Sequence, residues 1–120
     1  MNARRNPRAR LEDILAAIDK ILGRASGDRS AFMRDELLQV WVLYYLGVIG
    51  EAAACMDPPT TAAYPEVDWI ALSGTRNHLV HGYFDIDLAV VWEVVERDLP
   101  PLRDQIVGII DSMQGKDVHR

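Results

Sequence analysis

The run LLQVWVLYYLGVI, at positions 37–49, is apolar on nearly every side when it is drawn as a helix. A helix without a polar face has to be covered all round. In a bundle built from a chain of 120 residues, neighbouring helices rarely cover both faces of such a helix. We therefore expect part of it to contact a second subunit, in a two-fold homodimer. The alternative is a central helix that its own neighbours enclose.

Segments on either side of this run have helical periodicity as well. The predicted fold is an all-α antiparallel bundle of four to five helices, in one domain. Before the run, apolar residues recur every three or four positions over 11–22, and Gly23 ends that helix. The helix that contains the run is predicted to begin at Asp28 or Ser30 and to continue to Met56.

Prolines and glycines divide the second half of the chain. Because paired prolines cannot continue a helix, Pro58–Pro59 predicts a linker that reaches Pro65. A third, shorter helix follows, with a bend at Ser73–Gly74 and an end at Gly82.

Two more helices are predicted towards the C-terminus. Asp85 or Asp87 caps the fourth helix, which continues through Val95. Pro100–Pro101 bends the chain or restarts it before a final helix over 102–110.

Charge is distributed unevenly along the chain. The formal net charge is -5, but four of the 13 basic residues lie in the first ten positions, namely Arg4, Arg5, Arg8 and Arg10. We therefore predict a basic N-terminal arm (1–9), an acidic helical domain (10–113) and a polar tail (114–120). The arm is either a solvated terminus or a contact for nucleic acid, which would have to bind through a local patch.

Cysteine content and hydropathy bear on the cellular compartment. The single cysteine, Cys55, lies in an apolar stretch, so we expect a buried, reduced thiol and a cytoplasmic protein. The longest nearly apolar run, Val40–Gly50, is shorter than the roughly 20 residues of a membrane-spanning helix. We therefore expect no membrane segment.

The densest group of chemically capable side chains is RNHLVHGY, at positions 76–83. Arginine binds phosphate through a planar fork of donors, and histidine transfers protons near neutral pH. These are the groups needed to cleave RNA without a metal. On a regular helix Arg76 and His81 would point about 140° apart, whereas Asn77 and His81 share a face. The length of the arginine, or a change of backbone before Gly82, could bring Arg76 and His81 together.

Each of these residues also has a structural interpretation. Arg76 could pair with Glu51, the carboxylate in an otherwise apolar helix. His81 could bind helix-terminal carbonyls, and His78 could be a solvated or structural histidine. Tyr83 could be a core aromatic residue with a wet hydroxyl.

The string RNHLVHGYFDIDLAVVWEVVERDLPPLRDQI, beginning at Arg76, resembles the HepT-like branch of the HEPN superfamily. The segments IGEAA (49–53) and RLEDILAAIDKI (10–21) resemble the same branch. The resemblance implies an all-helical, homodimeric, metal-independent endoribonuclease that acts as the toxin of a toxin–antitoxin pair. The family motif Arg-x4-His-x-Tyr falls on Arg76, His81 and Tyr83.

By this resemblance, His81 is the catalytic acid or base and Arg76 stabilises the phosphate. Asn77, which shares a helix face with His81, either supports these two residues or forms hydrogen bonds at the helix end. Glu51 and His78 are further candidates for support. The partner implied is an MntA-like nucleotidyltransferase antitoxin that transfers AMP onto Tyr83, and RNA is the substrate. No cofactor and no metal ligand set are expected. The alternative is a non-catalytic helical bundle that binds substrate for a nucleotidyltransferase partner, and an unrelated dimeric bundle with an accidental motif is a third interpretation.

Overall fold

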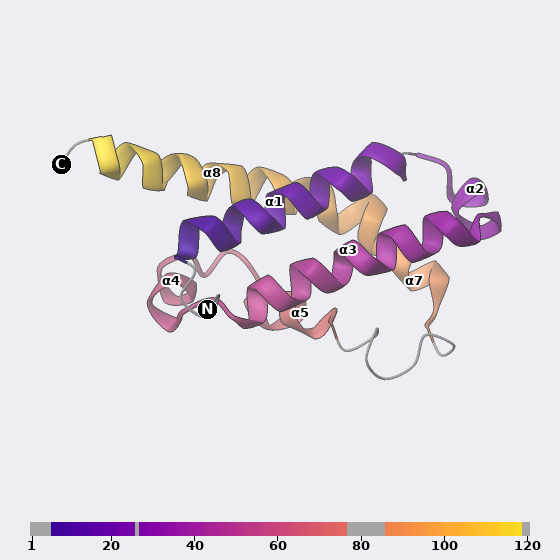
Figure 1. Ribbon diagram of the computed structural model, residues 1–120, viewed down its shortest axis with the longest axis horizontal. Coiled ribbons are helices and arrows are strands. Elements are labelled where there is room, and N and C mark those ends of the chain that lie inside the picture. The colour runs from indigo at the N-terminus through magenta and orange to yellow at the C-terminus, as the bar shows by residue number, and fades with distance from the viewer. Residues whose placement is uncertain (1–5, 26, 77–85, 119–120) are drawn as a thin grey trace.

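The computed structural model describes residues 6–25, 27–76 and 86–118, with side chains up to position 114. Its described part is built from helices, so the predicted all-α class is confirmed (Figure 1). The first helix, α1, spans Pro7–Arg24. It begins within the predicted arm because Asn6 caps it: the Asn6 side chain accepts a hydrogen bond from the backbone N–H of Ala9, and Pro7 occupies the first turn.

The predicted second helix is divided in two. A short helix, α2 (Arg29–Arg34), is followed by α3 (Glu36–Ala54), and Asp35 between them is extended. The expectation of one continuous helix is wrong because Asp35 serves as the N-cap of α3, and its side chain accepts a hydrogen bond from the N–H of Leu38. Across the break, the buried Gln39 side chain donates to the carbonyl of Phe32 at 2.9 Å.

The predicted linker contains a helix of its own. Helix α3 already ends at Ala54, and Pro58–Pro59 begins α4 (Pro58–Ala63), which Asp57 caps. Proline suits the first turn of a helix because the N–H groups there have no partner within the helix. Helix α5 (Trp69–Gly74) follows, capped by Asp68, and ends at the predicted bend. The rest of the predicted third helix, 77–82, lies outside the described residues.

Of the two predicted caps for the next helix, Asp87 is the one that caps α7 (Leu88–Glu93), and Asp85 lies outside the described residues. A π-helical turn, η3 (Val94–Asp98), then leads directly into α8 (Leu99–Val118), in which Leu99 donates its N–H to the carbonyl of Val94. The prediction was that Pro100–Pro101 bends or restarts the chain. In the structure these prolines lie in the first turn of α8, directly after the π-turn, and the helical run is continuous. Wider turns accommodate the two prolines, which lack an N–H and would clash with carbonyls one turn back.

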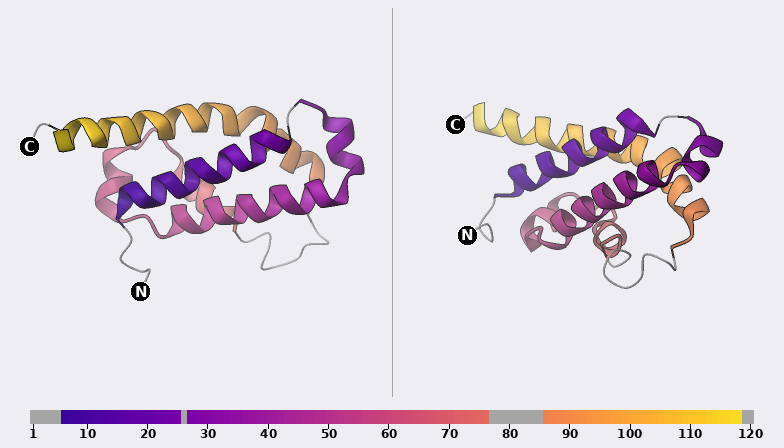
Figure 2. Two further views of the ribbon diagram at one scale, coloured as in Figure 1. Left: turned by 45° about the horizontal axis from the view of Figure 1, so that its top comes forward. Right: turned by 45° about the vertical axis from the view of Figure 1, so that its right-hand side comes forward.

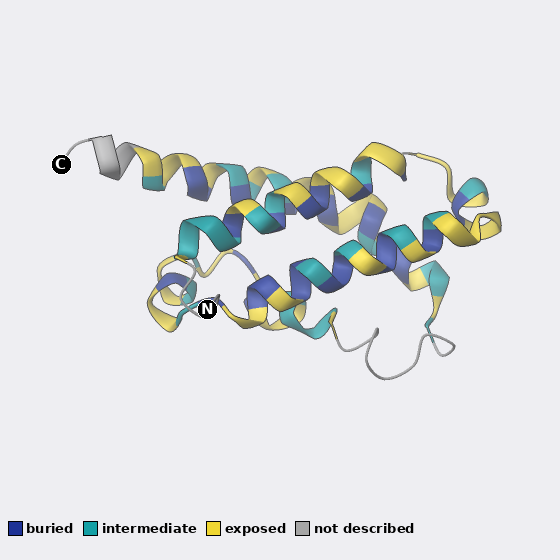
Figure 3. Cartoon of the chain, in the orientation of Figure 1, coloured by how far each residue is buried: buried dark blue, intermediate teal, exposed yellow. Residues whose placement is uncertain are grey.

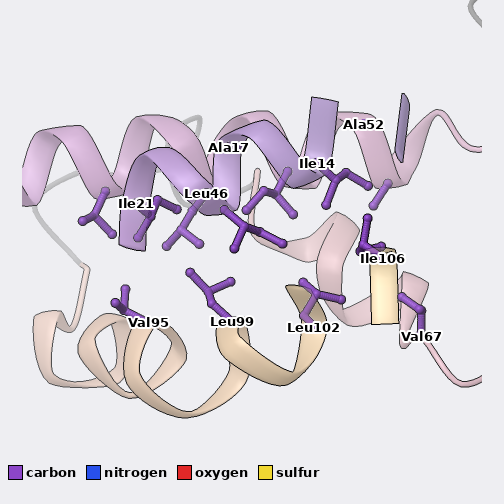
Figure 4. Close-up of a cluster of buried hydrophobic side chains, with 14 of the residues drawn as sticks. Ile14, Ala17, Ile21, Leu46, Ala52, Val67, Val95, Leu99, Leu102 and Ile106 are labelled. Carbon is purple, nitrogen blue, oxygen red and sulfur yellow. The ribbon is translucent and has the colours of Figure 1, made fainter. Parts of the chain in front are cut away.

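The helices form a layered bundle around one core. Helix α1 lies between α3 and α8 and runs antiparallel to both, while α5 packs on α3 (Figures 1 and 2). Side chains from each layer meet in the middle, as Figure 4 shows. The contributors include Ile14 and Ile21 of α1, Leu46 of α3, and Leu99 and Ile106 of α8.

One side of α3 is not covered by the described part of the chain. Leu37, Val40 and Tyr44 are 83%, 46% and 58% exposed, and they recur at helical spacing. Figure 3 shows exposed positions of the chain in yellow and buried positions in dark blue. The opposite side of α3 is buried in the core. Among the described residues, the neighbouring helices therefore cover one face of this apolar helix and leave the face with Leu37, Val40 and Tyr44 exposed.

By length and composition α3 could cross a membrane, which contradicts the estimate made from Val40–Gly50. That estimate was wrong because the helix extends beyond its uninterrupted apolar run at both ends. In the fold, however, 44% of its most apolar window is buried against other helices. Packing on α1 and α5 is typical of a core helix.

Candidate functional site

The predicted phosphate-binding arginine lines a surface cavity of about 410 Å³. Three elements form its walls: the first turns of α1, the C-terminal half of α3 and the turn after α5. The charged lining residues are Arg10, Asp13, Glu51 and Arg76, and Tyr44 adds an aromatic ring. The cavity thus combines cations, carboxylates and an aromatic side chain at an open surface.

Arg76 and Glu51 form an ion pair inside this cavity. Nη1 of Arg76 lies 3.0 Å from Oε1 of Glu51, which confirms the predicted pairing. The two side chains are 46% and 63% exposed, so solvent and ligands can reach both of them. The hydrogen bond from Arg76 is the main reason why the pKa of Glu51 lies below its usual value, and the thiol of Cys55 and the charge of Arg10 act in the same direction.

The backbone before Arg76 is fixed by hydrogen bonds to two elements. Asp68 caps α5 by accepting from the N–H of Ala71, and the N–H of Thr75 bonds to the carbonyl of Leu72. The Thr75 hydroxyl lies 2.8 Å from the carbonyl oxygen of Leu46 on α3. These contacts place Arg76 against the helix that carries Glu51.

Cys55 is exposed, contrary to the buried thiol that its apolar neighbours predicted. It directly follows α3, one turn after Glu51, and its Sγ lies 3.5 Å from Oε2 of that carboxylate. The prediction was wrong because α3 is not enclosed on all sides, so hydrophobic neighbours in sequence do not imply burial at this position.

The structure adds residues to the site that no motif indicated. Arg10 and Asp13 come from α1, and Tyr44 comes from α3 two turns before Glu51. No local spacing links them to Arg76. The only signal in the sequence was the basic character of the N-terminal segment that ends at Arg10.

Four of the predicted site residues lie outside the described residues: Asn77, His78, His81 and Tyr83. Their geometry relative to Arg76 therefore stays a prediction. Within the ranges 6–25, 27–76 and 86–118, no group of three or more His, Cys, Asp or Glu side chains could hold a metal ion. Arg76 and Glu51 are the predicted site residues that the described structure brings together.

Comparison with known proteins identifies the family to which these residues belong. Residues 13–109 match the family described as ribonuclease HepT-like. The chain belongs to the HepT-like ribonuclease family. The match begins within α1 and ends within α8, so for this HepT-like chain it includes Asp13, Glu51 and Arg76 of the cavity but not Arg10.

Relatives of this HepT-like chain occur in archaea and bacteria. A protein of Methanocaldococcus jannaschii named as a candidate RNase is 30% identical over 115 residues, which are 95% of each chain. A candidate RNase of Caldanaerobacter subterraneus is 28% identical over 109 residues, 90% of this chain and 97% of that protein. A candidate ribonuclease HepT of Thermococcus cleftensis is 33% identical over 72 residues, 60% of this chain and 66% of that protein. No solved structure gives a significant match.

Proposed function

We propose that this chain is a metal-independent endoribonuclease whose reaction takes place beside Arg76. The observation that carries the proposal is an exposed guanidinium in an open cavity of a HepT-like ribonuclease fold. A fork of N–H donors at a solvent-accessible surface suits a phosphodiester, which must enter and leave. The ion pair with Glu51 holds the fork in one orientation before substrate arrives.

The reaction needs a base, a cation and an acid. The base removes the proton of a ribose 2′-hydroxyl, and the 2′-oxygen attacks the adjacent phosphorus. The bond between phosphorus and the 5′-oxygen breaks, and the acid protonates the leaving oxygen. Products carry a 2′,3′-cyclic phosphate and a 5′-hydroxyl. His81 supplies one proton transfer, Arg76 stabilises the charge on the phosphoryl oxygens, and Asn77 supports them.

We propose that two copies associate through the uncovered face of α3. Leu37, Val40 and Tyr44 present a continuous apolar strip on that face, and Tyr44 also lines the cavity. An interface there would bring a second subunit to the edge of the site. A second histidine could then serve as the acid while the first serves as the base.

The toxin role and its control are part of the proposal. An MntA-like nucleotidyltransferase would silence the enzyme in the cytoplasm by transferring AMP from ATP to the hydroxyl of Tyr83, with release of pyrophosphate. The added phosphate is anionic and bulky, so it would compete with the RNA phosphate for Arg76. Tyr83 follows Arg76 by seven positions, which is the spacing of the family motif.

A single assay tests the nuclease proposal. The purified chain is incubated with a single-stranded RNA in the presence of EDTA, and the termini of the products are identified. We expect cyclic-phosphate and 5′-hydroxyl ends from the wild type, and losses of about 10²–10⁴-fold in Arg76→Ala and His81→Ala. Arg29→Ala is the matched control, because it removes the same charge from the exposed start of α2.

The same preparations test the alternative, a non-catalytic partner subunit. Intact mass is measured after incubation with an MntA-like nucleotidyltransferase and ATP. Addition of AMP to the wild type but not to Tyr83→Phe, together with loss of cleavage, supports the toxin. An RNA substrate left intact by the wild type, with faster turnover by the transferase, would instead support the partner subunit.

A further inference from the structure

Two pairs of consecutive residues face each other at the edge of the cavity. Gly50 and Glu51 lie near the end of α3, and Thr75 and Arg76 follow the end of α5. Glu51 binds the guanidinium of Arg76, while Gly50 lies against the backbone that carries it. Arg76 is therefore contacted at both ends of its side chain by adjacent residues of one helix.

The contact at Gly50 leaves no room for a side chain. A Cβ atom at position 50 would overlap the hydroxyl of Thr75, and it would lie 2.6 Å from the backbone nitrogen and 3.1 Å from the Cβ of Arg76. The backbone nitrogen cannot move away as the end of a flexible side chain can. The chain after α5 can approach α3 this closely only because residue 50 is a glycine.

Thr75 links the two segments at the same point. Its hydroxyl lies 2.8 Å from the carbonyl oxygens of both Leu46 and Leu72, so its one proton is shared between α3 and α5. Leu46 lies one turn before Gly50 on the same helix. The hydrogen bond from Thr75 and the close contact with Gly50 thus fix the backbone and the Cβ of Arg76 against α3.

We propose that Gly50 and Thr75 are positioning residues that set the place of Arg76 for RNA cleavage. The proposal rests on the proposed nuclease function. Placement matters because phosphoryl oxygens must meet the guanidinium at hydrogen-bond distance, and a displacement of about 1 Å can reduce a reaction rate about 10²-fold. A Cβ at position 50 would lie 2.6 Å from the backbone nitrogen of Arg76. To reach an ordinary van der Waals distance, the backbone of Arg76 would have to move by about 1 Å.

Glycine substitutions provide a matched pair of variants. In Gly50→Ala we expect kcat to fall by about 10-fold to 10²-fold while the helical circular dichroism is retained. In Gly108→Ala, within α8, a Cβ meets nothing within 4 Å, so activity is expected to remain at the wild-type level. Equal activity in both variants would overturn the assignment of Gly50.

Substitutions of Thr75 test the hydrogen bond without adding bulk near Gly50. Thr75→Ser keeps the hydroxyl and is expected to retain most of the activity. Thr75→Val keeps the shape but removes the donor, and we expect its kcat to fall more than tenfold below that of Thr75→Ser. Equal kcat values for these two variants would overturn the role of Thr75.

A double-mutant cycle on RNA affinity distinguishes an effect of Thr75 through Arg76 from a general loss of structure. Affinity is measured for an RNA that carries a 2′-deoxy group at the scissile position, in Thr75→Val, Arg76→Ala and the double variant. If Thr75 acts through Arg76, Thr75→Val weakens binding in the wild type but has no further effect in Arg76→Ala. Additive losses would contradict the proposal.

A readout that needs no RNA separates this inference from the nuclease proposal. The carboxyl group of Glu51 is titrated by NMR in each variant. Displacement of Arg76 in Gly50→Ala should raise the pKa of Glu51 towards its usual value, whereas Gly108→Ala should leave it unchanged. If the pKa of Glu51 is the same in Gly50→Ala as in the wild type, Gly50 does not position Arg76, even if the wild type cleaves RNA. A shifted titration in a chain that does not cleave RNA would instead count against the nuclease proposal alone.

Discussion

Nη1 of Arg76 and Oε1 of Glu51 lie 3.0 Å apart, although 25 positions separate the two residues in the chain. Both side chains are substantially exposed, so the ion pair adds about 1 kcal/mol or less to the free energy of unfolding. An interaction this weak can be exchanged for a phosphate group. Glu51 can therefore orient the guanidinium in the free protein without preventing it from binding RNA.

Replacing Glu51 by glutamine should tighten the binding of an uncleavable RNA up to about fivefold. The substitution removes a carboxylate that competes with phosphate for Arg76, and the pair it breaks is worth about 1 kcal/mol or less. Fluorescence anisotropy at fixed ionic strength measures the effect. Glu12→Gln is the control, because Glu12 forms a comparable exposed pair with Arg8 on α1. Weaker binding in Glu51→Gln than in this control would contradict the competition.

The ion pair should also give the stability a dependence on pH. Because Arg76 holds the pKa of Glu51 below its usual value, the stabilisation is present above the pKa of the unfolded state and is lost as the pH falls through the lower folded pKa. In Arg76→Ala we therefore expect the pKa of Glu51 to rise, as measured by NMR titration. Arg103→Ala breaks a pair with Asp19 on α1 and should leave the Glu51 titration in place. A titration curve for Glu51 that is the same in wild type and Arg76→Ala would refute the coupling.

Asp35 should stabilise the fold as the cap that separates α2 from α3. Asp35→Ala removes the acceptor for the N–H of Leu38 and should lower the free energy of unfolding by about 1 kcal/mol in urea titrations. Asp35→Asn keeps a side-chain oxygen and should lose only a fraction of that. Unfolding midpoints that fall equally in the two variants would show that capping is not the cause.

The uncovered face of α3 should control the oligomeric state. A glutamate at Val40 would place a charge in the centre of the proposed interface, so Val40→Glu should sediment as a monomer where the wild type sediments as a dimer. Ile70→Glu is the control, because Ile70 is 86% exposed and lies on α5. A wild type that stays monomeric at micromolar concentration would exclude the interface.

Helix positions were predictable where periodicity and capping agree. Apolar residues at three-and-four spacing identified α1. For α7 the sequence offered Asp85 or Asp87 as the cap, and the structure shows that Asp87 caps it. Prediction was wrong at Asp35 and at Pro58–Pro59, where a residue that can end one helix also begins the next. The local sequence is compatible with the end of one helix and with the start of another, and the positions of neighbouring helices decide which of these occurs.

Burial was harder to predict than helicity. Cys55 has the apolar sequence neighbours of a core residue but lies exposed beside Glu51. Arg10 joins the cavity although no motif includes it. Both outcomes depend on where α1 and α5 lie along α3, and this offset is a property of the packed bundle.

Local chemistry along the chain was enough to predict the helical class and to single out Arg76 as a candidate, because periodicity, caps and short motifs act over a few residues. The family followed from resemblance to known sequences and from the match over residues 13–109. Folding alone brought Arg10, Glu51 and Arg76 to one cavity from three separate elements. The meeting of Gly50 with Thr75 was likewise decided in three dimensions. Contacts between residues far apart in the chain arise from the packing of whole helices, and a local pattern does not encode the register in which two helices meet.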